Sequence, residues 1–256
     1  MSWRVVNHDE LLEATGASPY VDVAVPADAV AIVGEHGWAA MHPWRPSGHW
    51  GGAALVAPGA PPEAESQALA ELLALAPDTP LEWFSTSAGR QLAAPPGFLV
   101  DGSGRWDFLS TRVDVPPAGA VFPGDLELLE LDDATDAAEL EAFGRAHNTD
   151  FEGFPGHGFS VLWLGLRDAS SALVAIGGMH LLATGTPHLS GIVVDRAQRG
   201  RGIGRALTVA LTRRALDRCG VSTLGVFSSN APAISLYHSL GYRTHHRFHT
   251  RVLSAL

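Results

Sequence analysis

The chain of 256 residues contains no lysine and only one cysteine, Cys219. A single cysteine cannot form an intramolecular disulfide, and this usage is typical of a reducing compartment. No apolar run approaches the roughly 18 residues that a membrane-spanning helix needs, and the first residues lack the charged and then apolar pattern of a secretory signal. These absences predict a cytoplasmic protein with no membrane partner, and they favour a packed thiol over a nucleophile at Cys219.

Charge is spread unevenly along the chain, whose formal net charge is −10. Residues 153–256 contain 11 arginines and three acidic residues, whereas residues 1–120 contain five arginines and 14 acidic residues. A basic region attracts anionic ligands such as phosphates. It would also attract nucleic acid, but here several arginines fall on one predicted turn and helix while the rest of the chain is acidic. We therefore expect a phosphate-bearing small molecule and no nucleic acid.

A strand, a turn rich in arginine and glycine, and a helix are predicted in succession from His188 onward. The Ile and Val content of residues 189–195 is typical of a buried strand, and apolar residues recur at helical spacing over 203–211. The turn and the start of the helix consist of Arg199, Gly200, Arg201, Gly202, Ile203, Gly204 and Arg205.

This turn has the features of an anion site. The first backbone N–H groups of a helix lack internal partners and carry partial positive charge, and glycines let a ligand approach closely. A dinucleotide-binding turn would need its third glycine at another offset, and a Walker loop would need a lysine. The turn therefore predicts a diphosphate site of another kind, with an arginine-rich surface turn as the alternative.

A second motif follows a strand predicted at 223–227. Ser229 or Asn230 is suited to cap a helix in which Pro232 occupies the first turn. The motif comprises Asn230, Ala233, Tyr237, Gly241 and Tyr242.

Together the two motifs resemble the signatures of the GNAT superfamily of N-acetyltransferases. The turn is similar to the acyl-CoA loop (Gln/Arg)-x-x-Gly-x-(Gly/Ala), and the second segment is similar to Asn-x-x-Ala-x-x-x-Tyr-x-x-x-Gly-(Phe/Tyr). Residues 125–256 also follow the GNAT order β-α-β-β-β-α-β-α-β, with a capping box predicted at Asp136 and Glu139. The resemblance implies an α/β fold with a mixed sheet in this half of the chain.

The resemblance also implies a reaction and a cosubstrate. A GNAT enzyme moves the acetyl group of acetyl-CoA to a primary amine of a small molecule or peptide by direct attack on the thioester. The implied contacts to CoA are the backbone of Ile192, Val193 and Val194, residues 199–205, Asn230, Ala233 and Tyr237. Tyr237 is the implied general acid near the sulfur atom of CoA.

The general base is less clearly marked in the sequence. Many GNAT enzymes use a glutamate on the strand before the loop, but this strand has no acidic residue until Asp195. His188 titrates in a useful range, His180 is a second candidate, and Glu152 is a third that would act through water. Either histidine is equally well explained as a core or surface residue. The missing glutamate leaves a second function open, an acyl-CoA-binding regulatory protein whose catalytic step has been lost.

The first half of the chain is predicted to form a separate domain. Pro and Gly residues over 115–124 indicate a linker between a mixed α/β domain at 1–120 and the GNAT-like domain at 121–256. Strands are predicted at 29–38, 51–56, 81–85 and 107–113, and a helix at 63–75. This mixture fits a degenerate GNAT-like domain without a CoA site, because the first 120 residues contain no glycine loop.

Two further expectations concern side chains outside the motifs. Six of the seven tryptophans lie in the first 120 residues, where they either pack in a core or contribute to the acceptor pocket. His238, His245, His246 and His249 lie close together in sequence, but no cysteine or carboxylate accompanies them, so no metal site is expected. A monomer and a homodimer are both compatible with the sequence.

Overall fold

The computed structural model describes residues 2–44, 48–115 and 126–256. The described residues of the first half form six strands and three helices. They are β1 (Trp3–Val6), α1 (His8–Ala14), α2 (Pro19–Ala24), β2 (Val30–Gly34), β3 (Gly37–Pro43), β4 (Trp50–Val56), α3 (Ala64–Leu75), β5 (Leu81–Ser87) and β6 (Phe98–Thr111).

The second half repeats this order with small changes. Its elements are β7 (Glu127–Leu131), α4 (Ala137–His147), β8 (Ser160–Arg167), β9 (Leu173–Leu181), β10 (Pro187–Val194), the 3₁₀ turn Arg196–Gln198, α5 (Ile203–Cys219), β11 (Ser222–Phe227), α6 (Ala231–Ser239) and β12 (Arg243–Ala255). The order predicted for residues 125–256 is therefore confirmed. The first half has two short helices where the second has α4, and no helix corresponds to α6.

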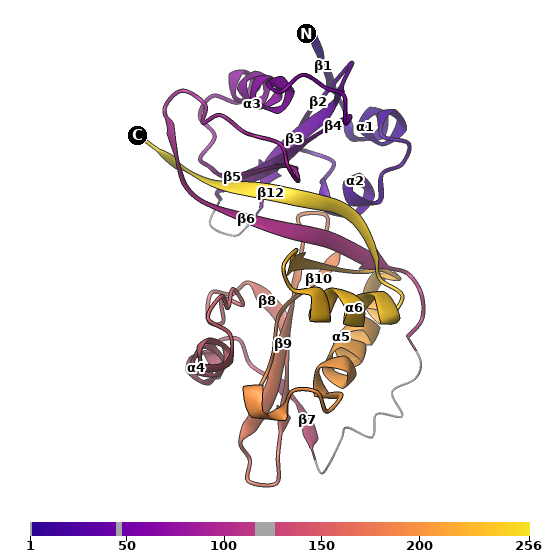
Figure 1. Ribbon diagram of the computed structural model, residues 1–256, viewed down its shortest axis with the longest axis vertical. Helices are drawn as coiled ribbons and strands as arrows, with labels where there is room; N and C mark the ends of the chain where they lie inside the picture. Colours follow the sequence, from indigo (N-terminus) through magenta and orange to yellow (C-terminus); the bar gives the residue numbers. More distant parts are fainter. Residues whose placement is uncertain (1, 45–47, 116–125) are drawn as a thin grey trace.

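All the described strands form one twelve-stranded sheet, in the order β1-β2-β3-β4-β5-β12-β6-β11-β10-β9-β8-β7. The last strand of each half is exchanged: β12 pairs with β5 of the first half, and β6 pairs with β11 of the second. The two exchanged strands also pair with each other over most of their length. Figure 1 shows them crossing the centre of the molecule, with the first half above and the second half below.

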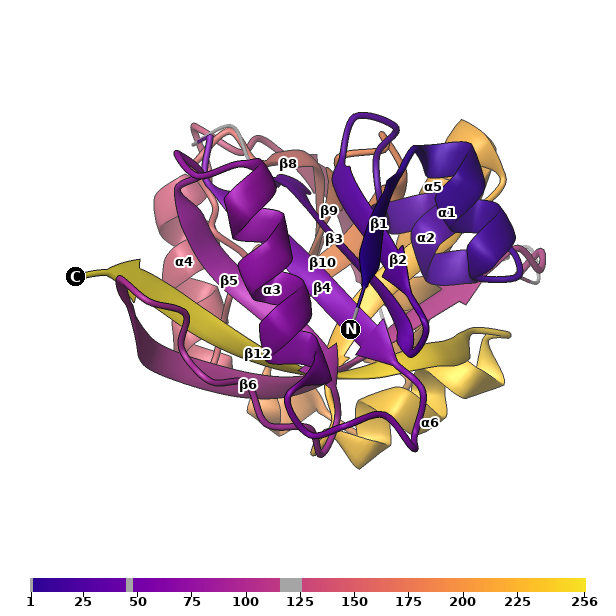
Figure 2. The same cartoon turned by 90° about the horizontal axis from the view of Figure 1, so that it is seen from above.

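The helices cover both faces of this sheet. Within the second half, α5 packs on one face of β8–β11 and α4 on the other, and the corresponding first-half helices are α3 and the pair α1 and α2. In Figure 1, α3 and α5 lie at diagonally opposite corners, and Figure 2 views the same arrangement from the side of α3. The strand order and the helix positions together describe an approximate two-fold repeat.

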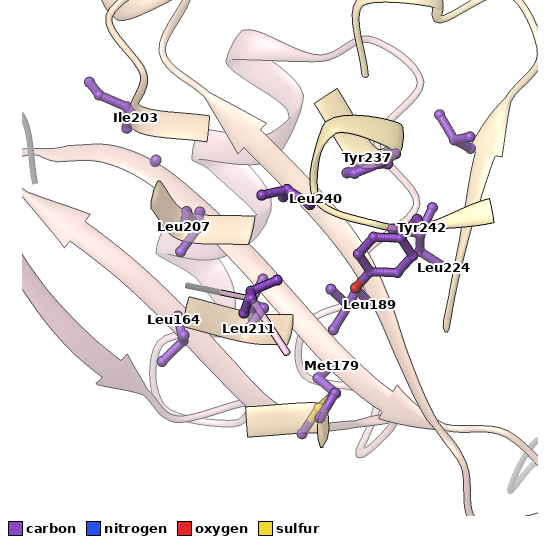
Figure 3. Packing of buried hydrophobic residues seen from close by; sticks show 14 of the residues in the cluster. Leu164, Met179, Leu189, Ile203, Leu207, Leu211, Leu224, Tyr237, Leu240 and Tyr242 are labelled. Atoms are coloured by element: carbon purple, nitrogen blue, oxygen red, sulfur yellow. The ribbon is translucent and has the colours of Figure 1, made fainter. Parts of the chain in front are cut away.

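The main core of the second half lies between α5, α6 and the sheet. Ile203, Leu207 and Leu211 of α5 are buried there against Leu189 of β10 and Tyr242 (Figure 3). These helix positions are spaced four residues apart, as the apolar pattern predicted. The core fixes the start of α5 against the end of β10, and the glycine turn joins these two ends.

Several predictions for the first half were wrong. The strand predicted at 29–38 is a hairpin, because Gly34 and Gly37 flank a two-residue turn and Gly37 has a φ of 156° that a side chain rarely adopts. β6 begins nine residues before the predicted start, and β1, α1 and α2 were not predicted. The predicted domain boundary between residues 120 and 121 lies outside the described residues.

Two local predictions for the second half also need correction. The Asp136 side chain does not cap α4, and it accepts instead from the Asp132 backbone, while Glu139 pairs with Arg167. Cys219 is exposed rather than packed. Cys219 is the last residue of α5, and the left-handed Gly220 turns the chain away directly after it, so the Cys219 side chain is not covered by the core.

Candidate functional site

The turn between β10 and α5 presents a row of unpaired backbone amides. Gly200 and Gly202 have φ values of 78° and 81°. Gly202 occupies the N-cap position of α5, and because glycine has no side chain the amides of the first helical turn have no side-chain cap. The first intrahelical bond runs from the Ala206 amide to the Gly202 carbonyl, 3.0 Å away. Within the part of the chain that the structure describes, no amide from residue 199 to residue 205 has an acceptor. Such a concave row at a helix N-terminus is suited to an anion.

Side chains hold this turn in place. Arg199 donates to the Val194 carbonyl at 3.2 Å and to the His147 carbonyl at 2.7 Å, and Arg196 donates to the same His147 carbonyl at 3.2 Å. The last turn of α4 is thereby tied to the loop. Arg201 bonds to Gln198, and Arg205 donates to Ser239 of α6 at 2.6 Å. The arginines predicted to contact phosphate thus also shape the turn.

The strands beside the turn separate from each other. β10 and β11 are parallel and pair only at His188 with Thr223 and at Leu189 with Leu224. Beyond Leu189, a bulge between Ser190 and Val193 interrupts the pairing of β10 with β9, and Gly191 within it has a φ of 60°. Of the predicted CoA contacts, Ile192 lies within this bulge, and Val193 and Val194 follow it. Their backbone borders the gap on the β11 side, where an extended ligand can add as a strand.

The corresponding strands of the first half do not separate in this way. β4 and β5 are parallel and remain paired at five positions, from Trp50 with Leu81 to Ala54 with Thr86. The loop from β4 to α3 also has no counterpart of the glycine turn. The two halves therefore differ at the strand pair that separates in the second half.

The second motif places two tyrosines in the same core with different surroundings. Asn230 is the N-cap of α6, and its side chain accepts from the Ala233 amide at 3.3 Å. The Tyr242 hydroxyl is hydrogen-bonded to Thr212 and Ser222, and burial raises its pKa to about 12. The Tyr237 hydroxyl has no hydrogen-bond partner among the described residues, and burial raises its pKa well above the ordinary value for tyrosine. Tyr237 therefore stays protonated at any working pH.

The loop between α4 and β8 lies against the bulge in β10. A Cβ atom on Gly191 would come within 3.2 Å of the Gly153 Cα atom and 3.1 Å of the Trp163 ring. Phe151 is buried below this contact. Glu152, between Phe151 and Gly153, is exposed. The exposed Glu152 thus belongs to the loop that contacts the bulge in β10.

His188 and His180 lie together on the face of the sheet that α4 covers. Their rings are 4.9 Å apart, and the His180 ring stacks on Phe159 at 4.1 Å. The Thr223 hydroxyl donates to the Pro187 carbonyl at 2.8 Å, so it must accept from His188 Nδ1, also 2.8 Å away. His188 Nε2 then carries a lone pair. Burial lowers the pKa of His188 to about 4, which keeps the ring neutral.

Three of the four histidines grouped near the C-terminus contact hydroxyl groups, and the Nδ1 atom of the fourth, His249, is buried without a hydrogen-bond partner among the described residues. His245 contacts the Ser110 hydroxyl, His246 contacts Ser18, and His238 contacts Thr244. Among the described residues, no group of three His, Cys, Asp or Glu side chains is arranged to hold a metal ion. In the same part of the chain, no helix is long and apolar enough to cross a membrane.

Sequence reasoning missed two residues beside this site: Thr223, which fixes the His188 tautomer, and Gly225, which borders the Nε2 atom. Trp106, one of the six tryptophans expected in a core or in the acceptor pocket, borders Gly225 from the exchanged strand β6. The β-strand period would have placed Thr223 and Gly225 on one face. The position of Trp106 depends on long-range pairing, which no local pattern reports.

Comparison with known proteins identifies the second half. Residues 128–242 match the family described as Acetyltransferase (GNAT) family, so this part of the chain is a GNAT acetyltransferase domain. A search of curated proteins finds no match.

Several solved structures have a fold similar to that of nearly the whole chain. A GNAT-family protein from Novosphingobium aromaticivorans is 21% identical with a TM-score of 0.57, covering 96% of both chains. A GCN5-related N-acetyltransferase from Kribbella flavida is 17% identical with a TM-score of 0.52, covering 96% of this chain and 95% of the other. A GCN5-related N-acetyltransferase from Sphaerobacter thermophilus is 17% identical with a TM-score of 0.52, covering 99% of this chain and 95% of the other. At these identities the likeness establishes the fold: a mixed α/β GNAT fold with one large sheet.

Proposed function

We propose that this protein is an acetyl-CoA-dependent N-acetyltransferase that acts on a primary amine. The observation that carries the proposal is the combination of the separated strands β10 and β11 with the row of unpaired amides at residues 199–205. The separated strands suit an extended arm that carries amide groups, and the row of unpaired amides suits a diphosphate. The GNAT domain at 128–242 supports acetyl-CoA as the molecule that has both.

In this proposal the cosubstrate is held mainly by backbone groups. The amides of residues 199–205 bind the diphosphate, while Arg201 and Arg205 add positive charge. The backbone of Ile192, Val193 and Val194 pairs with the pantetheine arm and polarises the thioester carbonyl. Asn230 and Ala233 line the path from the start of α6. The thioester supplies an activated acetyl group.

The amine nitrogen attacks the thioester carbon, the carbon–sulfur bond breaks, and CoA leaves as a thiol. The bound amine arrives as an ammonium ion, because its pKa resembles that of lysine, and Glu152 removes the proton through a water molecule. His188 Nε2 then accepts a hydrogen bond from the neutral amine and orients it. As the carbon–sulfur bond breaks, Tyr237 donates its hydroxyl hydrogen to the departing sulfur atom, and the nitrogen releases its second proton to water. Water then returns a proton to Tyr237, so the products are the amide and the thiol and the phenol is restored.

In a second candidate function, the protein binds acyl-CoA but does not transfer the acyl group. His188 has a pKa of about 4 and is therefore a weak base, and β10 carries no acidic residue. This favours an acyl-CoA-binding regulatory protein without turnover as the alternative.

One experiment separates the two candidates. The protein is incubated with acetyl-CoA and a broad panel of primary amines while free thiol is measured. Thiol release that depends on amine, and that falls in Tyr237→Phe while the Kd for acetyl-CoA is kept, supports the transferase. Tight binding of acetyl-CoA without release from any amine supports the regulatory protein, and the absence of binding overturns both.

A further inference from the structure

One face of three neighbouring strand segments carries only uncharged residues: 102–106 of β6, 225–227 of β11 and 248–252 of β12. On β12, β6 and β11, antiparallel pairing places Phe248 and Phe227 opposite Trp106, Thr250 opposite Gly104, and Val252 opposite Gly102. Residues in a strand alternate between faces. The charged residues of these stretches therefore lie on the other face: Asp101, Arg105, Asp107, Arg247 and Arg251. We name the first face the uncharged strip and define it by Gly102, Gly104, Trp106, Gly225, Phe227 and Val252.

The uncharged strip is open to solvent. Phe227 is 39% exposed, Val252 is 43% exposed, and Gly225 is exposed. A Cβ atom on Gly104 would have only Phe227 within 4 Å, and one on Gly102 would have only Val252. The two glycines thus leave a flat floor bordered by apolar side chains. Large apolar side chains grouped on an open surface are typical of a binding site.

The uncharged strip begins at the gap between β10 and β11. Gly225 directly follows Leu224, the last residue of β11 that pairs with β10. A Cβ atom on Gly225 would lie 3.5 Å from His188 Nε2 and 3.3 Å from the Trp106 ring. Gly225 thus lies directly beside both the imidazole proposed to orient the amine and the indole of Trp106, so the uncharged strip reaches the proposed site.

Trp106 is held rigidly although it comes from the first half. Its Nε1 atom donates to the Thr250 hydroxyl at 2.6 Å, and its ring stacks on Phe248 with centroids 4.7 Å apart. The strand exchange thus gives the second half a fixed aromatic surface beside its site. A fixed ring loses little entropy when a ligand packs on it.

We propose that the uncharged strip binds the amine acceptor, and that this acceptor is an arylalkylamine, a primary amine on a short alkyl chain attached to a flat uncharged ring. The inference rests on the proposed transferase function and names its substrate class. An aromatic ring gains contact area and favourable ring geometry against Trp106 and Phe227. Among the described residues, a polyamine or an acidic acceptor finds no opposite charge on the uncharged strip, so its second charge would lose water without compensation.

The test compares two acceptors and two pairs of variants. Tryptamine is the arylalkylamine probe, and spermidine is the charged comparator. Gly104→Leu fills the floor of the strip, and Gly59→Leu is its control, because Gly59 also has nothing within 4 Å. Phe227→Ser removes a wall, and Leu75→Ser is its control, because Leu75 is 47% exposed on α3. Thiol release reports turnover, and calorimetry of tryptamine with CoA present reports binding independently of it.

We expect kcat/KM for tryptamine to exceed that for spermidine by about tenfold or more. Gly104→Leu and Phe227→Ser should each lower kcat/KM for tryptamine about tenfold through KM, with KM for acetyl-CoA unchanged, and the controls should behave as the parent. Turnover that favours spermidine, or strip variants that match their controls, overturns the inference and leaves the transferase standing. Tryptamine binding that the strip variants weaken, without thiol release from any amine, overturns the transferase and keeps the strip as a ligand site. If the parent protein neither binds tryptamine nor releases thiol with any amine, both the transferase and the role of the strip are overturned.

Discussion

The rings of Tyr237 and Tyr242 lie 6.0 Å apart in one core, but only the Tyr242 hydroxyl is hydrogen-bonded within the described part of the chain. Figure 3 places both side chains in the cluster between α5, α6 and the sheet. The Tyr242 oxygen lies 2.8 Å from Thr212 and 2.6 Å from Ser222. The two buried phenols therefore differ in their hydroxyl groups: the Tyr242 hydroxyl has two partners, and the Tyr237 hydroxyl has none among the described residues.

Replacing Tyr237 with phenylalanine should lower kcat about 100-fold or more, because the departing sulfur loses its proton donor. The free energy of unfolding should change little, since no hydrogen bond of the described residues is lost. Steady-state kinetics with thiol detection measures the first quantity, and urea denaturation measures the second.

Tyr242→Phe is the matched control. It removes two buried hydrogen bonds and should lower the free energy of unfolding by about 1–3 kcal/mol, while kcat falls far less than in Tyr237→Phe. Equal kinetic effects in the two variants would refute the assignment of Tyr237 as the acid.

Glu152→Gln should lower kcat about tenfold or more at neutral pH, because the ammonium form of the acceptor then loses its base. Raising the pH should restore part of the rate, since more amine is neutral in solution. Asp150→Asn changes another exposed carboxylate of the same loop and should leave the pH–rate profile as in the parent. A profile that Glu152→Gln does not alter would assign the base elsewhere.

Gly200→Ala should weaken acetyl-CoA binding about tenfold or more. Gly200 has a φ of 78° with open space around it, so a methyl group both strains the turn and stands where the diphosphate approaches. Gly185→Ala imposes the same strain at a φ of 81° in the turn between β9 and β10. It should lower stability by about 1 kcal/mol without altering the Kd for acetyl-CoA. A similar loss of affinity in both variants would mean that general destabilisation explains the effect.

Stability should fall as the pH drops from about 6.5 toward about 4. Burial lowers the pKa of His188 and of His246 to about 4, whereas the ordinary value is 6.5. Between these values the unfolded chain binds protons that the folded chain does not, so the free energy of unfolding rises with pH in this window and is unaffected by these groups above it. Urea denaturation at several pH values measures the slope.

His246→Gln should flatten this pH dependence, because it removes one of the histidines whose pKa burial lowers. His238→Gln, at an exposed position on α6, is the control and should keep the slope. An unchanged slope in His246→Gln would show that other groups cause the acid sensitivity.

The helices and strands of the second half could be predicted from the sequence, because the residue patterns that specify them are local. The apolar period of α5, the N-cap at Asn230 and the glycines at 200 and 202 each act within a few residues, and the structure has each where it was predicted. The first half was harder. The residues Glu35 and His36 between two glycines are a turn signal that was overlooked, and the exposed start of β6 has two glycines that weaken any strand prediction.

The exchange of β6 and β12 could not be predicted from local patterns. The pairing of Trp106 with Phe227 and Phe248 joins residues more than 100 positions apart, and neither strand carries a signal for its partner. The surroundings of His188 depend on the same pairing. Candidate residues could thus be named from motifs, but the neutral tautomer of His188 and the open strip beside it required the fold.

The most direct test of the account is hydrogen–deuterium exchange with and without acetyl-CoA, followed at the amides of residues 199–205. We predict that acetyl-CoA strongly slows exchange at these amides, because they donate to the diphosphate, and that the loop joining β4 to α3 in the first half exchanges as before. Unchanged exchange at 199–205 in the presence of saturating acetyl-CoA, or slowing confined to the first half, would contradict the central claim.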